Sequence, residues 1–131
     1  MIYGTGIDIV EVQRMAQIIA RWGDHFLNRV FSPGEIEYCQ TGALPAMHYA
    51  ARFAAKESFL KSLGIGLGMG LALSDIEVAK DQHGKPTVSL RGRANNILNN
   101  LGVSVSHLSM SHTRQIATAM VVLEQVGSSH A

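Results

Sequence analysis

The spacing of apolar residues predicts how the chain begins. Residues 2–7 alternate loosely between apolar and polar types, which indicates a short strand. Beyond it, apolar residues recur at three- and four-residue intervals, the period of one helix face. This stripe consists of Val12, Met15, Ile19 and Trp22. We therefore predict a helix that begins near Asp8 and packs the stripe into a core.

Two further helices follow. The segment Ser32–Glu35 combines a capping serine, a proline at the first helical position and a glutamate three residues after the cap. A short helix should begin there. Residues 46–63 contain neither proline nor glycine and are rich in alanine, so they predict the longest helix of the chain. Gly64 should end it.

The second half of the chain alternates between strands and one helix. Residues 74–80 and 87–90 read as two strands, and the polar residues 81–86 between them indicate a hairpin. Apolar residues at helical spacing predict a helix over 94–101, which Gly102 should end.

The last two strands complete the expected fold. Residues 103–110 and 116–123 are strand-like, and the second run is nearly all apolar, which is typical of an interior strand. The order of elements favours an α+β fold, a largely antiparallel sheet packed with one long and several shorter helices. With no internal repeat, the chain should form one domain, residues 1–126, followed by a frayed tail, residues 127–131.

Composition narrows the function. Of 131 residues, 47% are hydrophobic and 16% charged, which leaves apolar surface for subunit contacts beyond a core. The net charge of +1 gives no reason to expect nucleic acid or an anionic membrane as partner. The single Cys39 cannot form an intramolecular disulfide, and neither a signal peptide nor a membrane-spanning run is recognisable. We expect a cytoplasmic protein.

Asp8 lies where the first strand is predicted to give way to a helix. Asp8-Ile-Val-Glu11 fits a capping box with aspartate as the cap, a structural role worth ~1 kcal/mol. A carboxylate at a strand end can also ligate Mg²⁺, which takes one or two protein carboxylates and completes its shell with water and phosphate oxygens. That second role requires another acid.

Glu57 is the candidate for the other acid. Lys61 follows it by one helical turn, the spacing of an ordinary exposed ion pair. Phe53 and Leu60 share the same stripe, however, so apolar groups flank the pair. A metal or phosphate site therefore competes with a surface ion pair, and the spacing alone does not decide between them.

Other polar segments support a binding cleft rather than a known nucleotide motif. Arg52 and Lys56 add two cations on an adjacent stripe of the same helix. Residues 64–70 carry glycine at every second position, but they follow a helix and lack the Gly-Lys-Ser/Thr ending, which excludes a P-loop. Ser109–Thr113 lacks the Gly-x-Ser-x-Gly elbow of a serine hydrolase and remains a polar turn that can line a cleft.

Taken together, these motifs resemble the holo-acyl-carrier-protein synthases, small members of the 4′-phosphopantetheinyl transferase superfamily. The matching segments cover nearly the whole chain in the expected order. They are Gly6–Glu11, Arg52–Ser58 with Lys61 and Gly64, Gly84–Pro86 and Ser111–Thr113. The most specific part is Asp8 with Phe53–Glu57 and Lys61.

The resemblance implies transfer of the phosphopantetheine arm of coenzyme A to a serine of apo acyl carrier protein, with adenosine 3′,5′-bisphosphate released. Asp8 and Glu57 would hold Mg²⁺ on the pyrophosphate, and Lys61 would stabilise the leaving phosphate. The base that accepts the serine proton stays open between Glu57 and a water on the metal. Residues implied to bind coenzyme A are Arg52, Gly64, Gly66, Lys85, Pro86, His112 and Thr113.

The resemblance also implies partners. It indicates a homotrimer with active sites between subunits and a role in fatty acid biosynthesis. Acyl carrier proteins are acidic, so the implied docking surface carries Arg14, Arg21 and Arg29. A non-catalytic oligomer that binds coenzyme A or another nucleotide remains the alternative. Lys56 stays open between a solvated cation and an interface contact.

Overall fold

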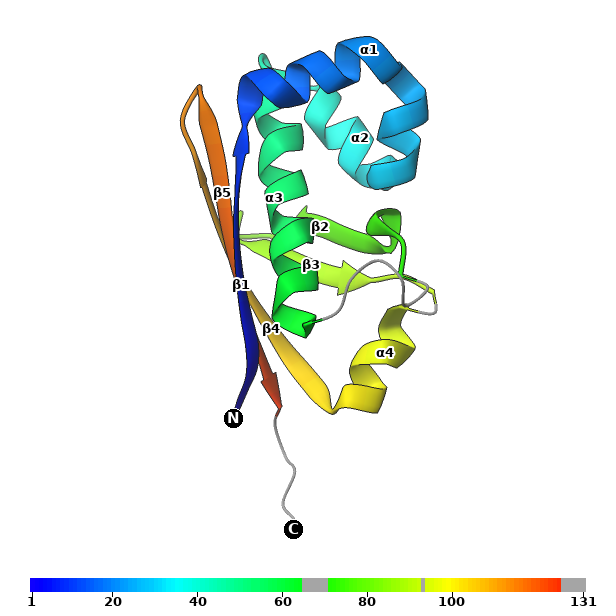
Figure 1. The fold of residues 1–131 in the computed structure, drawn as a ribbon, viewed down its shortest axis with the longest axis vertical. Coiled ribbons are helices and arrows are strands. Elements are labelled where there is room, and N and C mark those ends of the chain that lie inside the picture. Colours follow the sequence, from blue (N-terminus) through cyan, green and yellow to red (C-terminus); the bar gives the residue numbers. More distant parts are fainter. Residues whose placement is uncertain (65–70, 93, 126–131) are drawn as a thin grey trace.

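A computed structural model describes residues 1–64, 71–92 and 94–125. The elements follow in the order β1 (Ile2–Glu11), α1 (Val12–Val30), α2 (Pro33–Gln40), α3 (Pro45–Leu63), the short 3₁₀ helix η2 (Leu73–Asp75), β2 (Ile76–Lys80), β3 (Pro86–Leu90), α4 (Ala94–Leu101), β4 (Val103–His112) and β5 (Ile116–Gln125) (Figure 1). No helix within the described ranges is long and apolar enough to cross a membrane.

The main sheet has three antiparallel strands in the order β1-β5-β4, and β2 and β3 form a separate antiparallel hairpin. The helices lie on one side of the main sheet, with α3 packed along it (Figure 1). This arrangement confirms the predicted α+β class, and the nearly apolar β5 is the central strand of its sheet, as predicted.

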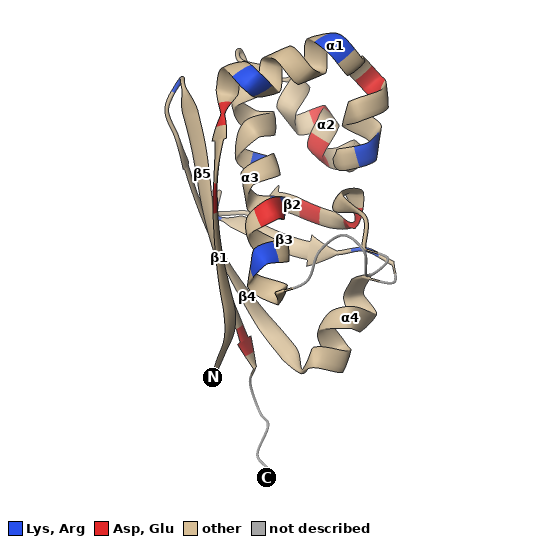
Figure 2. Ribbon diagram, in the orientation of Figure 1, with Lys and Arg blue, Asp and Glu red and all other residues tan. Residues whose placement is uncertain are grey.

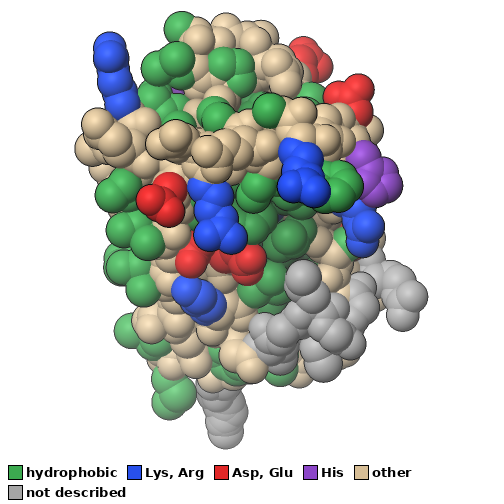
Figure 3. All heavy atoms as spheres, turned by 45° about the horizontal axis from the view of Figure 1, so that its top comes forward, with side chains coloured by type: hydrophobic (Ala, Val, Ile, Leu, Met, Phe, Trp, Pro, Cys, Tyr) green, Lys and Arg blue, Asp and Glu red, His purple; other side chains and the backbone are tan. Residues whose placement is uncertain are grey.

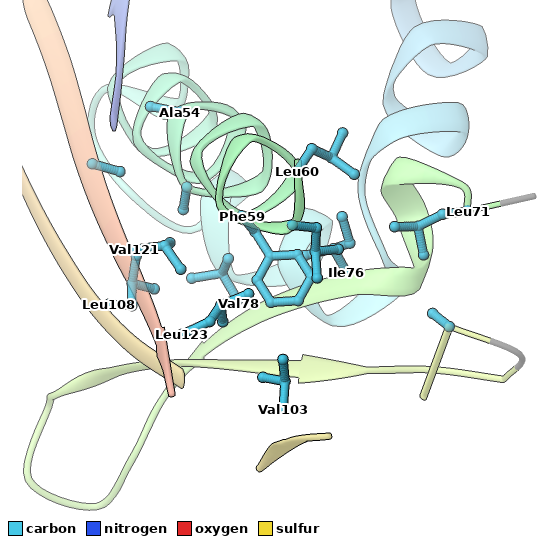
Figure 4. Close-up of a cluster of buried hydrophobic side chains, with 14 residues drawn as sticks. Ala54, Phe59, Leu60, Leu71, Ile76, Val78, Val103, Leu108, Val121 and Leu123 are labelled. Carbon is cyan, nitrogen blue, oxygen red and sulfur yellow. The ribbon is translucent and has the colours of Figure 1, made fainter. Parts of the chain in front are cut away.

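Alternate residues of β5 form the floor of the core. Ala119, Val121 and Leu123 are almost fully buried and face α3, whose Phe59 is completely buried. Phe59 points into a cluster between the main sheet and the β2–β3 hairpin, where Ile76 and Val78 complete the packing (Figure 4). The core therefore fixes α3 against both sheets.

Glycines in β1 let the strand lie directly on the backbone of α3. A Cβ atom on Gly6 would stand 1.9 Å from the carbonyl oxygen of Ser58, and one on Gly4 would stand 2.0 Å from that of Ser62. Any larger residue would push strand and helix apart, because those contacts are with backbone atoms. The close approach brings the side chains that follow Gly6 next to the side chains of α3.

Several predicted helix ends are confirmed. Ser32 and Glu35 form the reciprocal capping box at the start of α2. Gly64 ends α3 with φ of 74°, and Gly102 follows α4 with φ of 72°, values that favour glycine.

Lys56 is fully buried, so the interpretation of a solvated cation is wrong. Its ammonium lies 2.7 Å from the Glu35 carboxylate and also donates to the carbonyl oxygens of Leu73 and Ile76. The second oxygen of Glu35 accepts from the backbone N–H of Val78. This network joins α2 and α3 to the β2–β3 hairpin.

Two expectations for the first helix are wrong. Strand β1 continues to Glu11 and α1 begins at Val12, so Asp8 lies inside a strand and caps no helix. Trp22 is 54% exposed, although the stripe placed it in the core. Gly23, with φ of 54°, kinks α1 immediately after Trp22, so Trp22 lies at the end of a helical segment and not inside a continuous helix.

The side of the main sheet that faces away from the helices carries exposed apolar residues. Ile7 and Ile9 of β1 and Met120 of β5 are 64%, 67% and 47% exposed. Ile7 and Met120 are paired across the two strands. No described element covers this side (Figure 1).

Candidate active site in two halves

Asp8, Glu57 and Lys61 form an acidic half-site between β1 and α3. The Lys61 ammonium lies 3.1 Å from Asp8 Oδ1 and 2.9 Å from the carbonyl oxygen of Ile7, to which it donates. Lys61 thus pairs with the aspartate of the strand, and among the described ion pairs none joins it to Glu57. The structure therefore disfavours an ordinary Glu57–Lys61 surface pair.

The electrostatics of Glu57 suit a cation. Partial burial raises the pKa of Glu57, the neighbouring Asp8 raises it further, and Lys61 lowers it in part. Two carboxylates that repel each other are a donor set for a divalent ion, which would relieve the repulsion. The described residues hold no cluster of three or more metal-binding side chains, so such an ion would take most of its shell from water and phosphate, as Mg²⁺ does.

A cavity opens beside these acids. It encloses about 550 Å³ between β1, α1 and α3, and Asp8 and Glu57 stand in its wall. Apolar side chains, among them Met15 and Phe53, make up much of the remaining lining, and Arg14 of α1 also lines the cavity. Acidic and basic side chains gather beside apolar surface on this face of the molecule (Figure 3). The cavity offers a mainly apolar space next to a charged centre.

A basic half-site surrounds Arg52. A pocket of about 210 Å³ is lined by Arg52, Lys80, Pro86 and His112, and His48 completes the basic group. Arg52 is 3% exposed, and its Nε is buried without a hydrogen-bond partner. Because an unsatisfied buried donor is costly, this atom points to an absent acceptor such as a phosphate oxygen.

Sequence reasoning missed His48 and Lys80. His48 precedes Arg52 by four residues on α3, the spacing that places two side chains on one helix face. Lys80 pairs with Pro86 across the hairpin. Both signals were present in the sequence, but each becomes informative only once Arg52 and Pro86 are known to share a pocket.

The remaining predicted residues lie nearby or outside the described chain. Lys85 stands exposed in the hairpin turn, where its backbone N–H donates to Asp81. Thr113 organises the β4–β5 turn by accepting two backbone N–H groups on its hydroxyl. Gly64 ends α3 beside Lys61, and Gly66 lies outside the described residues. Neither Lys85 nor Thr113 lines the basic pocket.

Basic residues are spaced along α1, the helix that forms one wall of the cavity. Arg14, Arg21 and Arg29 are all exposed, and Figure 2 shows basic positions spaced along this helix. Arg14 lines the cavity that contains Asp8 and Glu57. The helix therefore presents positive charge next to the acidic half-site.

The two half-sites share no lining residue within one chain. Arg52 and Glu57 are five positions apart on α3, which turns their side chains about 140° away from each other around the helix. The acidic half therefore faces one side of α3 and the basic half another. One chain alone does not present both to a single small ligand.

Fold and site together define a small α+β protein with two neighbouring carboxylates and a lysine beside one cavity and a separate basic pocket. Residues 4–119 match the 4′-phosphopantetheinyl transferase superfamily. The chain belongs to this superfamily, which confirms the resemblance noted from its motifs.

Individual relatives agree. The chain is 56% identical over 124 residues to the holo-acyl-carrier-protein synthase of Syntrophus aciditrophicus, covering 95% of this chain and 97% of that protein. The crystal structure of the Neisseria meningitidis holo-acyl-carrier-protein synthase superposes with a TM-score of 0.89 at 34% identity, over 95% of this chain and 99% of the other. The Helicobacter pylori synthase, solved in complex with coenzyme A, gives 0.81 at 31% identity, over 92% and 99%.

Proposed function

We propose that this protein transfers the 4′-phosphopantetheine arm of coenzyme A to a serine of apo acyl carrier protein and releases adenosine 3′,5′-bisphosphate. The relatives are named for this activity, and one of them was solved with coenzyme A. The observation that carries the proposal in this chain is the juxtaposition of Asp8, Glu57 and Lys61 beside a cavity. We place the reaction in the cytoplasm, in support of fatty acid biosynthesis.

The acidic half-site supplies the reacting centre. Asp8 and Glu57 would hold Mg²⁺, which when bound neutralises charge on the pyrophosphate of coenzyme A. Lys61, whose ammonium pairs with Asp8, would donate to the phosphate that leaves. The serine of the carrier protein reaches the phosphorus atom through the cavity beside these residues.

The basic half-site binds the nucleotide end. Arg52 supplies a buried guanidinium with a free donor for a phosphate, and His112 and Pro86 form walls of the same pocket. Lys85 and Thr113, on the turns next to this pocket, would contact the parts of the nucleotide that extend out of it. Gly64 and Gly66, which follow Lys61 in the sequence, would contact coenzyme A from the side of the acidic half-site. These contacts hold coenzyme A so that its pyrophosphate meets the acidic half-site.

A direct assay tests the proposal. The protein is incubated with coenzyme A, Mg²⁺ and several apo acyl carrier proteins, and the carriers are weighed by mass spectrometry. We expect each good partner to gain the mass of one phosphopantetheine arm. If coenzyme A binds but no carrier gains mass, the protein is a binding module and not a transferase.

The assembly that fits both half-sites is a homotrimer with each active site between two subunits. Two observations support it. The half-sites lie on different sides of α3 in one chain, and Ile7, Ile9 and Met120 leave an uncovered apolar sheet face for subunit contact. A neighbouring subunit would bring its basic half against the acidic half of the first.

Mixing two inactive variants tests the shared site. Glu57→Gln damages only the acidic half and Arg52→Gln only the basic half. In randomly mixed trimers a site is intact when its acidic half comes from the Arg52 variant and its basic half from the Glu57 variant, so about one quarter of wild-type activity should return. Activity is measured after the subunits are co-refolded.

The matched control mixes Glu57→Gln with Asp8→Asn. Both changes damage the acidic half, so every mixed site keeps a defect and no activity should return. Equal recovery in the two mixtures, or none in the first, would contradict a site shared between subunits.

The carrier protein should dock on α1. Its acidic surface is attracted to Arg14, Arg21 and Arg29, and Arg14 lines the cavity. We expect Arg14→Glu to raise the KM for the carrier protein roughly tenfold or more, with little change in the affinity for coenzyme A. Arg91→Glu, the same charge change between β3 and α4, is the control. Equal damage to carrier and coenzyme A binding would refute the docking assignment.

A further inference from the structure

The basic pocket holds several cationic or ionisable groups without an acidic partner. Within the described part of the chain, no ion pair includes Arg52 or Lys80. The groups repel one another: burial lowers the pKa of His48, and Arg52, His112 and Lys80 lower it further. Something other than a carboxylate must hold these side chains close together.

Tyr38 of α2 contacts three of these groups. Its ring centre lies 4.2 Å from the guanidinium carbon of Arg52 and 5.3 Å from the ammonium of Lys80. The ring of His48 meets it edge-on, with centroids 5.6 Å apart. Lys80 is the main cause of the lowered pKa of Tyr38, and Arg52 lowers it further, as expected for two cations next to this side chain. Tyr38 does not itself line the pocket.

An aromatic ring and a carboxylate have different effects on a cation. Both attract it, but a carboxylate also cancels its charge, whereas the ring face attracts through its quadrupole and leaves the net charge unchanged. A pocket built to bind an anion needs cations that are held in place and still positive. The position of Tyr38 meets both needs.

We propose that Tyr38 is a positioning residue of the basic pocket, whose ring holds Arg52 and Lys80 in place without neutralising them. Both charges then remain available to a phosphate group of coenzyme A. This inference rests on the proposed function, because it takes the nucleotide end of coenzyme A as the ligand. Tyr38 acts through Arg52 and Lys80 and makes no contact of its own with the ligand.

Calorimetry of adenosine 3′,5′-bisphosphate binding to the full-length protein tests the proposal. We expect Tyr38→Leu, which removes the ring, to weaken binding about tenfold, and Tyr38→Phe, which keeps it, to stay within about threefold of wild type. Tyr38→Glu, which supplies a neutralising carboxylate, should bind at least as weakly as Tyr38→Leu. Wild-type affinity in the Leu or Glu variant, or equal losses in the Leu and Phe variants, would overturn the proposal.

Kinetics separate positioning from a general loss of structure. Tyr38→Leu should raise the KM for coenzyme A by the same factor, with kcat and the KM for the carrier protein unchanged. A fall in kcat with no change in the KM for coenzyme A would contradict the proposal. Should Tyr38→Leu fold poorly by thermal unfolding, Tyr38→Met, which also lacks the ring, replaces it in every measurement.

Two further variants complete the design. Trp22→Leu removes another exposed ring that lies against an arginine, Arg21 at 5.2 Å, and should leave the nucleotide affinity unchanged. Arg52→Gln should weaken binding more than Tyr38→Leu. If wild type binds no nucleotide, the proposed function fails; if Arg52→Gln weakens binding and Tyr38→Leu does not, only the role of Tyr38 fails.

Discussion

Replacing Glu57 by glutamine is expected to lower kcat at least about a thousandfold, because metal stabilisation of transition-state charge is worth several kcal/mol. Glutamine keeps the size of the side chain but cannot repel Asp8 or ligate Mg²⁺ as a carboxylate does. The measurement is the rate of carrier-protein modification at saturating coenzyme A and Mg²⁺. Glu37→Gln, the same chemical change at an exposed position of α2, should leave the rate unchanged.

The same substitution should stabilise the metal-free protein. The pKa of Glu57 is raised in the fold, so protonation favours the folded state, and that advantage is lost as the pH rises through the raised pKa. At neutral pH the charged Glu57 therefore destabilises the folded state, and glutamine removes this destabilisation. We expect Glu57→Gln to melt at a higher temperature than wild type at neutral pH, with the difference fading below the ordinary pKa of a glutamate.

Mg²⁺ provides the decisive comparison. At a fixed concentration of coenzyme A, adding Mg²⁺ should raise the melting temperature of wild type but not that of Glu57→Gln. If the variant melts lower than wild type without metal, Glu57 contributes to the fold and its assignment to a metal centre is wrong.

Gly6→Ala is expected to damage both fold and site. Its added Cβ would lie 1.9 Å from the Ser58 carbonyl oxygen and 2.9 Å from the Ser62 nitrogen, both backbone atoms of α3. Overpacking of this kind costs roughly 1–3 kcal/mol and sometimes more. Relief requires β1 to move off α3, which carries Asp8 away from Glu57. The free energy of unfolding, measured with denaturant, and the reaction rate per folded molecule should therefore both fall.

Gly102→Ala separates these two effects. Gly102 has φ of 72°, and a Cβ added there would lie 3.8 Å from its nearest neighbour, the side-chain nitrogen of Gln125. Alanine there should cost about 1–2 kcal/mol through backbone strain, with no clash and no loss of activity per folded molecule. If Gly6→Ala is destabilised but its folded fraction keeps full activity, the close approach of β1 does not position the acids.

Much of the fold could be predicted because its signals are local. The Ser32 capping box, the glycine stops at 64 and 102 and the apolar run of β5 each depend on residues within a few positions. The end of β1 could not be predicted in this way. Asp8 and Glu11 fit a capping box, but pairing with β5 as far as Glu11 keeps them extended.

Only the part of the site that depends on local spacing could be predicted. Glu57 and Lys61 share a helix stripe, but their relation to Asp8 depends on the contact of β1 with α3, which no local pattern reveals. Lys56 shows the limit most clearly. Its ion partner, Glu35, lies in a different helix. The sequence alone therefore left Lys56 open between a solvated and an interface residue, whereas the structure shows it fully buried.

The pairing of β1 with β5 has a consequence for folding during synthesis on the ribosome. Asp8 is fixed in part by strand partners near the other end of the chain, and its carbonyl oxygen accepts from the Thr118 hydroxyl at 2.9 Å. Residues so far apart in sequence meet only after nearly the whole chain has been synthesised. Helix α3 can form early in the nascent chain, but Glu57 faces an Asp8 held in its final position only after the last strand, β5, has emerged.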